Sequence, residues 1–156
     1  PHNAQILHGT IKSNMKIINK QANDEDIEEA LNNANVNFIK SLDDEVSQDG
    51  SNLSGGQKQR LSIARSILKK CDFYLFDDCF SALDMNSEKI VKKNLSDLND
   101  SSILIVSQRI SSVKDADEIL VMNNGEIIDR GTHNGLVESC DLYKEIVANQ
   151  QGILGD

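Results

Sequence analysis

The fold is decided by the stretch from Phe73 to Asp78, which reads FYLFDD. Its first four residues are apolar, and a second apolar run, from Ile103 to Val106, reads ILIV. Short, wholly apolar runs are expected of strands that are buried on both faces of a parallel sheet. Between the two runs, residues 87–98 carry apolar side chains at helical spacing and predict the crossover helix that a parallel pair requires. The centre of the chain therefore predicts a βαβ unit and an α/β fold.

The residues before this unit predict helices separated by polar segments. Residues 23–34 place apolar side chains at helical spacing behind an asparagine suited to an N-cap, with acidic residues in the first turn. Residues 36–42 predict a shorter helix, and residues 43–52 predict a polar, acidic loop. Residues 54–70 predict a second amphipathic helix, with lysines near its negative carboxyl end. The first part of the chain is therefore expected to be mainly helical.

The residues after the βαβ unit predict a hairpin and two helices. Residues 119–122 and 126–130 flank an Asn-Gly step that ends at Gly125, and such a step tolerates the positive φ angles of a tight turn. Two helices, at residues 133–138 and 141–149, are expected to follow. The chain therefore predicts an antiparallel pair of strands near its end.

The bulk properties restrict the class of ligand. The chain has 156 residues, about the size of one domain, and a formal net charge of -9. A sequence-independent nucleic-acid binder needs clustered cations, so this charge argues against nucleic acid as a partner. A mononucleotide stays allowed, because backbone amides, a helix terminus and a bound metal hold phosphates whatever the net charge. The apolar runs are far shorter than the about 20 residues that cross a bilayer, so membrane association is expected to come through another segment or chain.

Two adjacent carboxylates, Asp77 and Asp78, follow the first predicted strand. Open α/β sheets place their ligand sites at the carboxyl ends of strands. Because Mg²⁺ prefers oxygen ligands and often keeps several waters, one interpretation is a magnesium and water-activation site. The other interpretation is that the two acids merely cap the following loop. The motif is short and leaves both interpretations open.

The start of the helix at residues 54–70 also has two interpretations. Ser54, with Gln57 three residues later, matches a capping box, in which both side chains satisfy backbone amides. Gly55 and Gly56 allow backbone amides to approach an anion closely, Ser54 adds a hydroxyl donor, and the helix dipole favours negative charge. The two roles can coexist at one helix terminus.

Three motifs follow one another along the chain. Residues 53–60 read LSGGQKQR, residues 77–78 are the two aspartates, and residues 81–84 read SALD. This ordered set resembles an ABC-type ATPase. The resemblance extends from residues 9–11, which are similar to the exporter segment after the Q-loop, to residues 131–133, and so covers nearly the whole chain.

The resemblance implies a fold and its subdivision. The fold is part of a P-loop NTPase (RecA-like) core with parallel strands, an α-helical signature subdomain and a terminal β-hairpin. The chain, residues 1–156, then corresponds to the carboxyl-terminal portion of one ATP-binding domain. Its expected parts are a helical subdomain over about 9–70, part of the core over about 71–149, and a tail at 150–156.

The resemblance also implies ligands. In this family, two ATP molecules are sandwiched between two ATP-binding domains, each facing the Walker motifs of one domain and the signature of the other. The implied cofactors are ATP and Mg²⁺, with Asp77 holding Mg²⁺ through water. Ser54, Gly55 and Gly56 would meet the γ-phosphate of a nucleotide that is held mainly by a partner domain. The residues implied at the nucleotide are Leu53, Ser54, Gly55, Gly56 and Gln57 of the signature, Ser81 and Asp84 of the D-loop, and His2, which aligns with the Q-loop glutamine.

Three positions depart from the family pattern. Asp78 stands where a glutamate usually polarises the attacking water, and misplacement of a carboxylate by about 1 Å can cost about a hundredfold in rate. Gln108 stands at the position of the switch histidine, and an amide cannot shuttle a proton at neutral pH. His2 replaces the Q-loop glutamine, with Gln5 close by. Asp78 and Gln108 together resemble the degenerate half of a heterodimeric multidrug-type exporter, in which the intact signature completes the partner's competent site.

The phosphate-binding loop of the family is not found among these residues. None of the nine glycines is followed by lysine, so the pattern Gly-x-x-x-x-Gly-Lys-Ser/Thr (Walker A) does not occur. We expect these 156 residues alone to bind ATP weakly or not at all and to be inactive as an ATPase.

The function implied is that of an ATP-binding part of an ABC exporter, at the cytoplasmic face of the cell membrane. Its expected partners are a second ATP-binding domain, in a heterodimer, and transmembrane domains. Residues 45–50 resemble the X-loop, through which the ATP-binding domains of exporters contact the transmembrane domains. One alternative is a non-catalytic interaction fragment that binds a partner domain without supporting transport. Another is a soluble ABC ATPase outside transport, which the stretch 45–50 disfavours.

Overall fold

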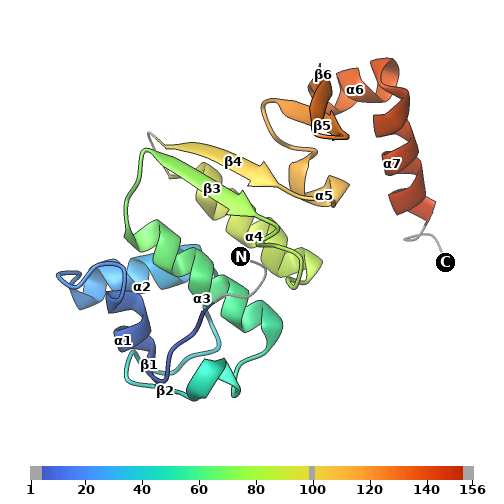
Figure 1. Cartoon of the computed structure of the whole chain (residues 1–156). Coiled ribbons are helices and arrows are strands. Elements are labelled where there is room, and N and C mark those ends of the chain that lie inside the picture. The colour runs from blue at the N-terminus through green and yellow to red at the C-terminus, as the bar shows by residue number, and fades with distance from the viewer. Residues whose placement is uncertain (1–4, 99–100, 153–156) are drawn as a thin grey trace. The chain divides into compact units, whose positions relative to one another are not determined.

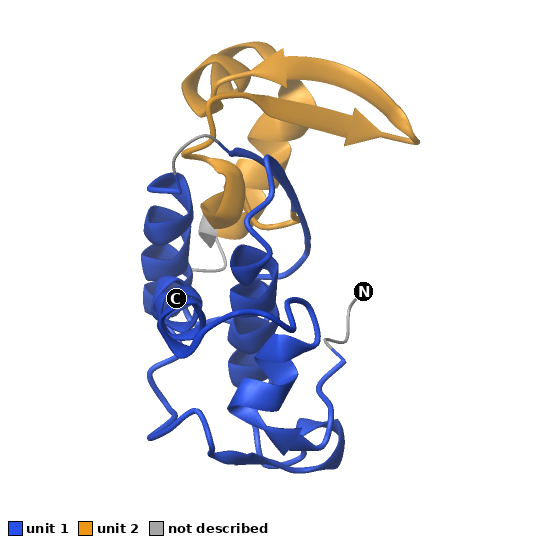
Figure 2. Ribbon diagram, turned by 90° about the vertical axis from the view of Figure 1, so that its left-hand side faces the viewer, with its two compact units in different colours: residues 1–106 blue, residues 107–156 orange. Residues whose placement is uncertain are grey.

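A computed structural model describes residues 5–98 and 101–152 of the chain. It divides the chain into two compact units, residues 1–106 and residues 107–156, which Figure 2 shows in different colours. The elements of both units are labelled in Figure 1.

The first unit contains the predicted βαβ unit. Strand β3 (Phe73–Asp77) pairs in parallel with β4 (Ser102–Val106), with Leu75 opposite Leu104. Helix α4 (Met85–Ser96) lies between them in sequence and begins two residues earlier than its apolar pattern predicts. The early start follows from Asp84, whose side chain accepts a hydrogen bond from Ser87 N at 2.9 Å and so caps the helix.

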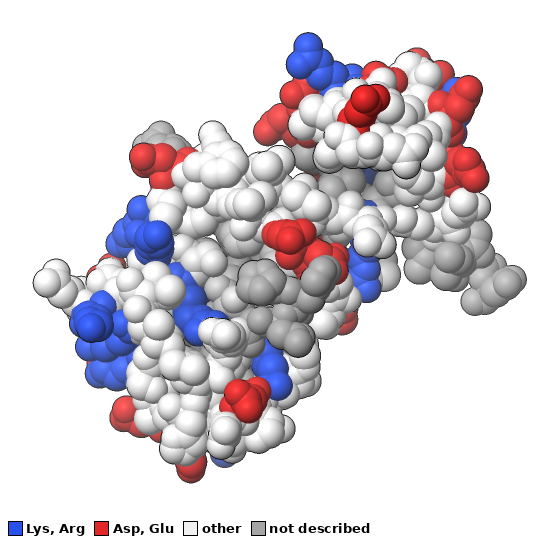
Figure 3. Space-filling view, viewed as in Figure 1, with Lys and Arg blue, Asp and Glu red and all other residues white. Residues whose placement is uncertain are grey.

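The expectation that both strands are buried on both faces is wrong for the described residues. Exposure alternates along β3: Tyr74 and Phe76 are buried, whereas Phe73 and Leu75 are 56% and 61% exposed. Leu104 on β4 is exposed as well. In Figure 3, uncharged side chains cover the area of these strands. Helices therefore cover one face of this sheet and leave the other face, although it is apolar, in contact with solvent.

The first unit also contains helices α1 (Ile11–Lys16), α2 (Asp24–Asn33) and α3 (Gly55–Leu68). The N-cap predicted for α2 is confirmed, since the side chain of Asn23 accepts from Asp26 N at 2.7 Å. One apolar cluster joins the three helices to α4 and the covered face of β3, and its members include Met15, Leu61 and Phe76. This shared core fixes the position of α3 relative to the carboxyl end of β3.

The short helix predicted at residues 36–42 is not formed. Asn35 has a φ of 54°, which ends the helical run, and its carbonyl accepts a hydrogen bond from the Arg60 guanidinium at 2.8 Å. Further along, Lys40 N donates to the carboxylate of Asp44 at 2.6 Å. Side chains thus occupy backbone groups that a helix would have paired within itself.

The loop predicted at residues 43–52 contains two short regular pieces. Strand β2 (Glu45–Val46) pairs antiparallel with β1 (Gly9–Thr10), and the 3-10 turn η1 spans Gln48–Gly50. The amide of Asn52 donates to Glu45 O at 2.9 Å, and Lys58 Nζ donates to Asp49 O at 2.8 Å. The segment before α3 is therefore tied to the first turns of that helix.

The second unit contains the predicted hairpin. Strands β5 (Ile119–Asn123) and β6 (Glu126–Gly131) are antiparallel, and the turn between them has Asn124 at φ 50° and Gly125 at φ 84°. Three helices accompany it: α5 (Ile110–Val113), which the apolar pattern does not predict, α6 (His133–Ser139) and α7 (Asp141–Gly152). Helix α7 runs three residues beyond its predicted end. The unit has its own apolar core, which includes Val121, Leu136 and Tyr143.

Candidate functional site

The amino terminus of α3 carries the sequence-predicted signature. Ser54 is the N-cap: its hydroxyl accepts from Gln57 N at 3.2 Å, while Ser54 N donates to the side-chain oxygen of Gln57 at 2.8 Å. The capping box is therefore confirmed. A serine hydroxyl has one hydrogen to donate besides its acceptor lone pairs, so capping leaves the Ser54 O–H available to a ligand. Ser54 and Gly55 are both exposed.

The glycines at this terminus differ in what surrounds them. A Cβ placed on Gly56 would lie 2.8 Å from the carbonyl oxygen of Ala82, too close for any side chain without backbone movement. A Cβ on Gly55 would lie 3.6 Å from the Cβ of Ala82, an ordinary contact. Gly56 thus lets α3 approach the segment 81–84 closely. The amide of Gly55 is one of the first amides of the helix, which have no partner within it, and it is open to solvent.

Gln59, one turn into α3, ties the signature to the segment 81–84. Its amide nitrogen donates to Ser81 Oγ at 3.1 Å, and its amide oxygen accepts from Ala82 N at 2.9 Å. Ser81 Oγ in turn donates to Asp78 O at 2.9 Å. The structure therefore connects three of the sequence-predicted motifs through side chains of a single unit.

Asp77 and Asp78 lie at the carboxyl end of β3, where the sequence predicts them. Asp77 is the last residue of the strand and is exposed, opposite Val106 of β4. Asp78 has a φ of 46°, a conformation that aspartate tolerates better than most residues. Its amide donates to Val106 O at 2.8 Å. Because its carbonyl also holds Ser81, the backbone of Asp78 is fixed on both sides.

The segment 81–84 ends at the cap of α4. Asp84 is exposed, and the hydrogen bonds from Ser87 lower the pKa of its carboxyl below the usual value. Leu83 is buried in the core beneath it. Asp84 is therefore held as a carboxylate in a fixed orientation at the positive end of a helix.

Leu53, the remaining signature residue, packs partly against the core of the first unit, and its amide donates to Gly50 O at 2.9 Å. Gln108 belongs to the second unit, where it is exposed in the segment before α5. His2 lies outside the described residues, whereas its neighbour Gln5 lies within them and accepts a hydrogen bond from Arg65 at 2.6 Å. Among the predicted site residues, the structure thus brings Gly55 and Gly56 to the segment 81–84, and Ser81 to Asp78.

Three residues of the first unit, to which the sequence motifs assign no role, hold segments of other elements in place. Gln59 is one, although it lies within the quoted motif. Asn14 is fully buried, and its side-chain amide pairs with both backbone groups of Leu7, at 2.9 and 2.8 Å. Arg65, at the far end of α3, bonds to Gln5, and its burial lowers the pKa of its guanidinium. No local pattern marks these residues, since each acts on a backbone segment from another element.

The donor set at the end of β3 fits a largely hydrated magnesium ion. Mg²⁺ is commonly held through one or two carboxylates together with substrate phosphates and several waters. Asp77 offers one exposed carboxylate at this position. Within residues 5–98 and 101–152, no group of three or more His, Cys, Asp or Glu side chains could enclose a metal ion by itself.

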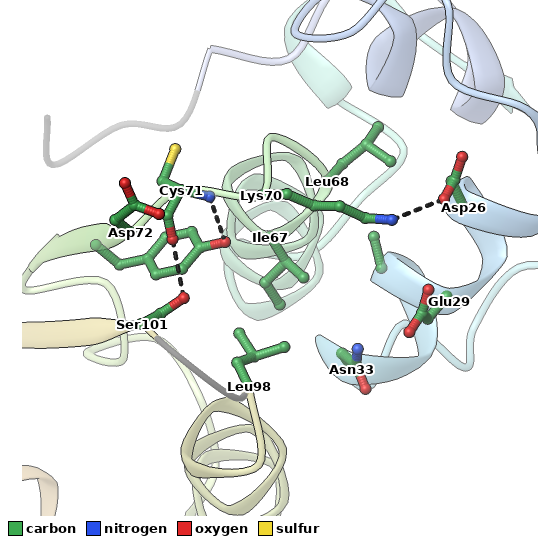
Figure 4. A pocket seen from close by; sticks show the side chains of 12 residues that line it. Asp26, Glu29, Asn33, Ile67, Leu68, Lys70, Cys71, Asp72, Leu98 and Ser101 are labelled. Carbon is green, nitrogen blue, oxygen red and sulfur yellow. Dashed lines mark hydrogen bonds and ion pairs between the residues drawn. The ribbon is translucent and has the colours of Figure 1, made fainter.

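A pocket of about 310 Å³ lies elsewhere in the first unit (Figure 4). At its edge, Lys70 extends toward Asp26 of α2 and pairs with it at 2.9 Å, which raises the pKa of Lys70. None of the predicted site residues lines this pocket. The residues that line it are Asp26, Glu29, Ala30, Asn33, Ile67, Leu68, Lys70, Cys71, Asp72, Tyr74, Leu98 and Ser101. The predicted site is instead an open surface.

No helix in the described part of the chain has both the length and the apolar character needed to cross a bilayer.

Comparison with known proteins identifies relatives over nearly the whole chain. Residues 2–81 match the family model described as ABC transporter. The chain is 38% identical over 156 residues to a putative export ATP-binding/permease protein of Rickettsia felis, covering 96% of this chain and 27% of that protein. It is 36% identical over 157 residues to an uncharacterized ABC transporter ATP-binding protein of Mycobacterium tuberculosis, with the same two coverages. An ATP-dependent lipid A-core flippase of Francisella novicida is 35% identical over 148 residues, covering 90% of this chain and 25% of that protein.

A solved structure shares the fold. A bacterial Atm1-family ABC exporter with ATP bound superimposes with a TM-score of 0.89 at 29% identity, covering 96% of this chain and 28% of that chain. The predicted α/β fold is therefore confirmed, and the chain spans about a quarter of the length of these relatives. Since the family model covers more than half of the 156 residues, the chain belongs to the ABC transporter family.

Proposed function

We propose that the chain is the carboxyl-terminal portion of an ATP-binding domain in an ABC exporter, and that its signature completes an ATP site held mainly by a second such domain. The observation that carries this proposal is the exposed, capped terminus of α3, where Ser54 keeps a free hydroxyl hydrogen and Gly55 presents an open amide. Such a terminus binds phosphate groups through its amides and its dipole. An open surface suits a site that a partner closes.

The domain's own site is proposed to bind ATP and hydrolyse it poorly. Asp78 holds a shorter carboxylate than the glutamate expected there, and its backbone is anchored to Val106 and Ser81, so the chain cannot advance to compensate. Gln108 offers an amide in place of an imidazole, which leaves binding possible but removes a proton carrier. Mg²⁺, held through Asp77 and the nucleotide, would neutralise phosphate charge there.

The partners proposed are a second ATP-binding domain, in a heterodimer, and transmembrane domains that contact residues 45–50. Glu45 is exposed on β2, and Lys58, at the end of the first turn of α3, donates to the carbonyl of Asp49. A movement of this segment is therefore transmitted to the signature helix. This arrangement supports an exporter, at the cytoplasmic face of a membrane, over a soluble ATPase outside transport. The net charge of -9 supports the absence of nucleic acid among the partners.

The test is steady-state ATP hydrolysis by the parent protein, the longer protein that contains this chain, assembled with its partner. Ser54→Arg places a bulky cation on the signature and should lower turnover by about tenfold or more, because charge-assisted hydrogen bonds contribute about 1.5–3 kcal/mol each. Asp78→Asn should change turnover by less than about twofold, because this domain's own site contributes little. Ser96→Arg is the control, because it makes the same change at an exposed serine, the last residue of α4, away from the signature. Equal and severe losses from Ser54→Arg and Asp78→Asn would contradict the proposal.

A further inference from the structure

The segment that carries Gln108 is held by a side chain from the last helix. The amide nitrogen of Gln150, in α7, donates to Gln108 O at 2.7 Å, and its amide oxygen accepts from Ile110 N at 2.8 Å. Both ends of one side-chain amide are therefore used, on either side of Arg109. Gln150 lies 42 and 40 residues from its two partners along the chain.

These bonds replace a cap that α5 does not have. Arg109 is the N-cap residue of α5 and makes no side-chain cap hydrogen bond, although the first amides of a helix need acceptors from outside it. Gln150 supplies the acceptor for Ile110, the first residue of the helix. On the other side, Ser107 Oγ accepts from Arg109 N at 3.0 Å. Consecutive backbone groups around Gln108 are thus fixed by side chains.

We infer that Gln150 is a positioning residue for Gln108: by bonding the carbonyl of Gln108 and the amide of Ile110, it fixes the backbone on the carboxyl side of Gln108 and so sets the direction in which the Gln108 side chain meets the terminal phosphate of ATP. The inference rests on the proposed function, which places Gln108 at the nucleotide of this domain's own site. ADP lacks the phosphate that Gln108 would contact. Loss of Gln150 should therefore weaken ATP binding and leave ADP binding unchanged.

The bonds that Gln150 makes to the backbone are tested without nucleotide, by hydrogen exchange at the amide of Ile110 in the parent protein. Gln150→Met keeps the length of the side chain and removes both bonds, so exchange should become about three- to tenfold faster, as expected for one hydrogen bond. Gln150→Glu keeps an acceptor for Ile110 and loses the donor to Gln108 O, so exchange should stay near that of the wild type. Asn149→Ala, at an exposed neighbour on α7, is the control. Unchanged exchange in Gln150→Met would overturn the inference whatever the function of the protein.

The effect of Gln150 on nucleotide binding is tested by the ratio of ATP to ADP affinity at this domain's site. The measurement uses a protein whose partner domain has lost its phosphate-loop lysine. Gln150→Met and Gln150→Glu should both lower the ratio about three- to tenfold with ADP affinity unchanged, and neither should act further in a Gln108→Ala background. A merely structural role would weaken ATP and ADP alike, and that result would overturn the inference. If Gln108→Ala itself leaves the ratio unchanged, the role proposed for Gln108 is wrong, a failure distinct from that of the Gln150 contact.

Discussion

The side-chain amide of Gln59 donates to the hydroxyl of Ser81 at 3.1 Å and so joins the signature helix to the segment that follows Asp78. The same amide accepts from Ala82 N, and Ser81 donates onward to the carbonyl of Asp78. These contacts form a continuous path from the surface proposed to face a partner's nucleotide to the backbone carbonyl of Asp78, a residue proposed to lie at the domain's own site. A change at one site thus has a physical route to the other.

Removal of the Gln59 amide should loosen this path. Gln59→Ala leaves the amide of Ala82 without its acceptor and Ser81 without a donor, which should lower the free energy of unfolding by about 1–3 kcal/mol. Gln59→Glu keeps an acceptor for Ala82 and should cost less. Urea denaturation measures both, with hydrogen exchange at Ala82 as the local readout. Equal stability of the wild type and Gln59→Ala would show that the path contributes nothing to the fold.

The two signature glycines should respond differently to alanine. Gly56→Ala places a Cβ 2.8 Å from Ala82 O, and the forced shift should cost about 1–3 kcal/mol of stability. Gly55→Ala makes an ordinary contact at 3.6 Å and should leave stability unchanged or raise it by up to about 1 kcal/mol. Thermal unfolding of the two variants, side by side, distinguishes them. A larger loss in Gly55→Ala than in Gly56→Ala would contradict the assigned geometry.

Asp84 should make the stability of the protein depend on pH in the acid range. The hydrogen bonds from Ser87 lower its folded pKa below the usual value of an aspartate. A lowered folded pKa means that the contribution of the carboxylate is complete above the unfolded pKa of about 3.9 and is lost as pH falls through the folded pKa. The stability difference between the wild type and Asp84→Asn should therefore be largest above about pH 4 and shrink below it.

Urea denaturation at a series of pH values measures this difference. Asp97→Asn, at the carboxyl end of the same helix, is the matched control, because removal of a negative charge there should stabilise α4 at neutral pH. A difference between the wild type and Asp84→Asn that grows as the pH falls would refute the assignment of the cap.

Cys79, next to Asp78, should be inert toward thiol reagents in the folded protein. Burial raises the pKa of its thiol to about 12. At pH 8 its thiolate fraction is then about a thousandfold below that of an ordinary cysteine with a pKa near 8.5, and the thiolate is the reactive form. Maleimide labelling followed by peptide mass spectrometry, in native buffer and in urea, measures the ratio. Rapid native labelling at Cys79 would show that this end of β3 opens readily.

The two departures from the family pattern should be reversible. In a parent protein whose partner site is disabled by Ser54→Arg, Asp78→Glu together with Gln108→His should raise ATP hydrolysis at the domain's own site, by up to about a hundredfold. The backbone contacts of Asp78 do not depend on its side chain, which favours the substitution. Each single change should give less than the pair. A pair that adds no turnover would mean that other features keep this site inactive.

The sequence by itself determined what depends on neighbours along the chain. The capping box at Ser54 and the N-cap at Asn23, the parallel strands and their crossover helix, and the hairpin turn at Asn124-Gly125 follow from local spacing and from the backbone preferences of single residue types. The ordered motifs, which are also local, led to the correct fold. The helix expected at residues 36–42 is wrong, because Arg60, far along the chain, bonds the carbonyl of Asn35 at the start of that segment.

Only the tertiary structure decided how these pieces act on one another. It brought Gln59 to Ala82, Arg65 to Gln5, 60 residues away, and Gln150 to Gln108, 42 residues away. It also left one face of β3 exposed where the apolar run predicts burial on both. The physical reason is tertiary packing in each case. Packing brings a distant backbone group within about 3 Å of a side-chain amide or guanidinium, which then bonds it. Packing also decides which elements cover a face of the sheet, and so which side chains are buried. The spacing of apolar residues along the sequence predicts neither these long-range contacts nor the covering of a sheet face.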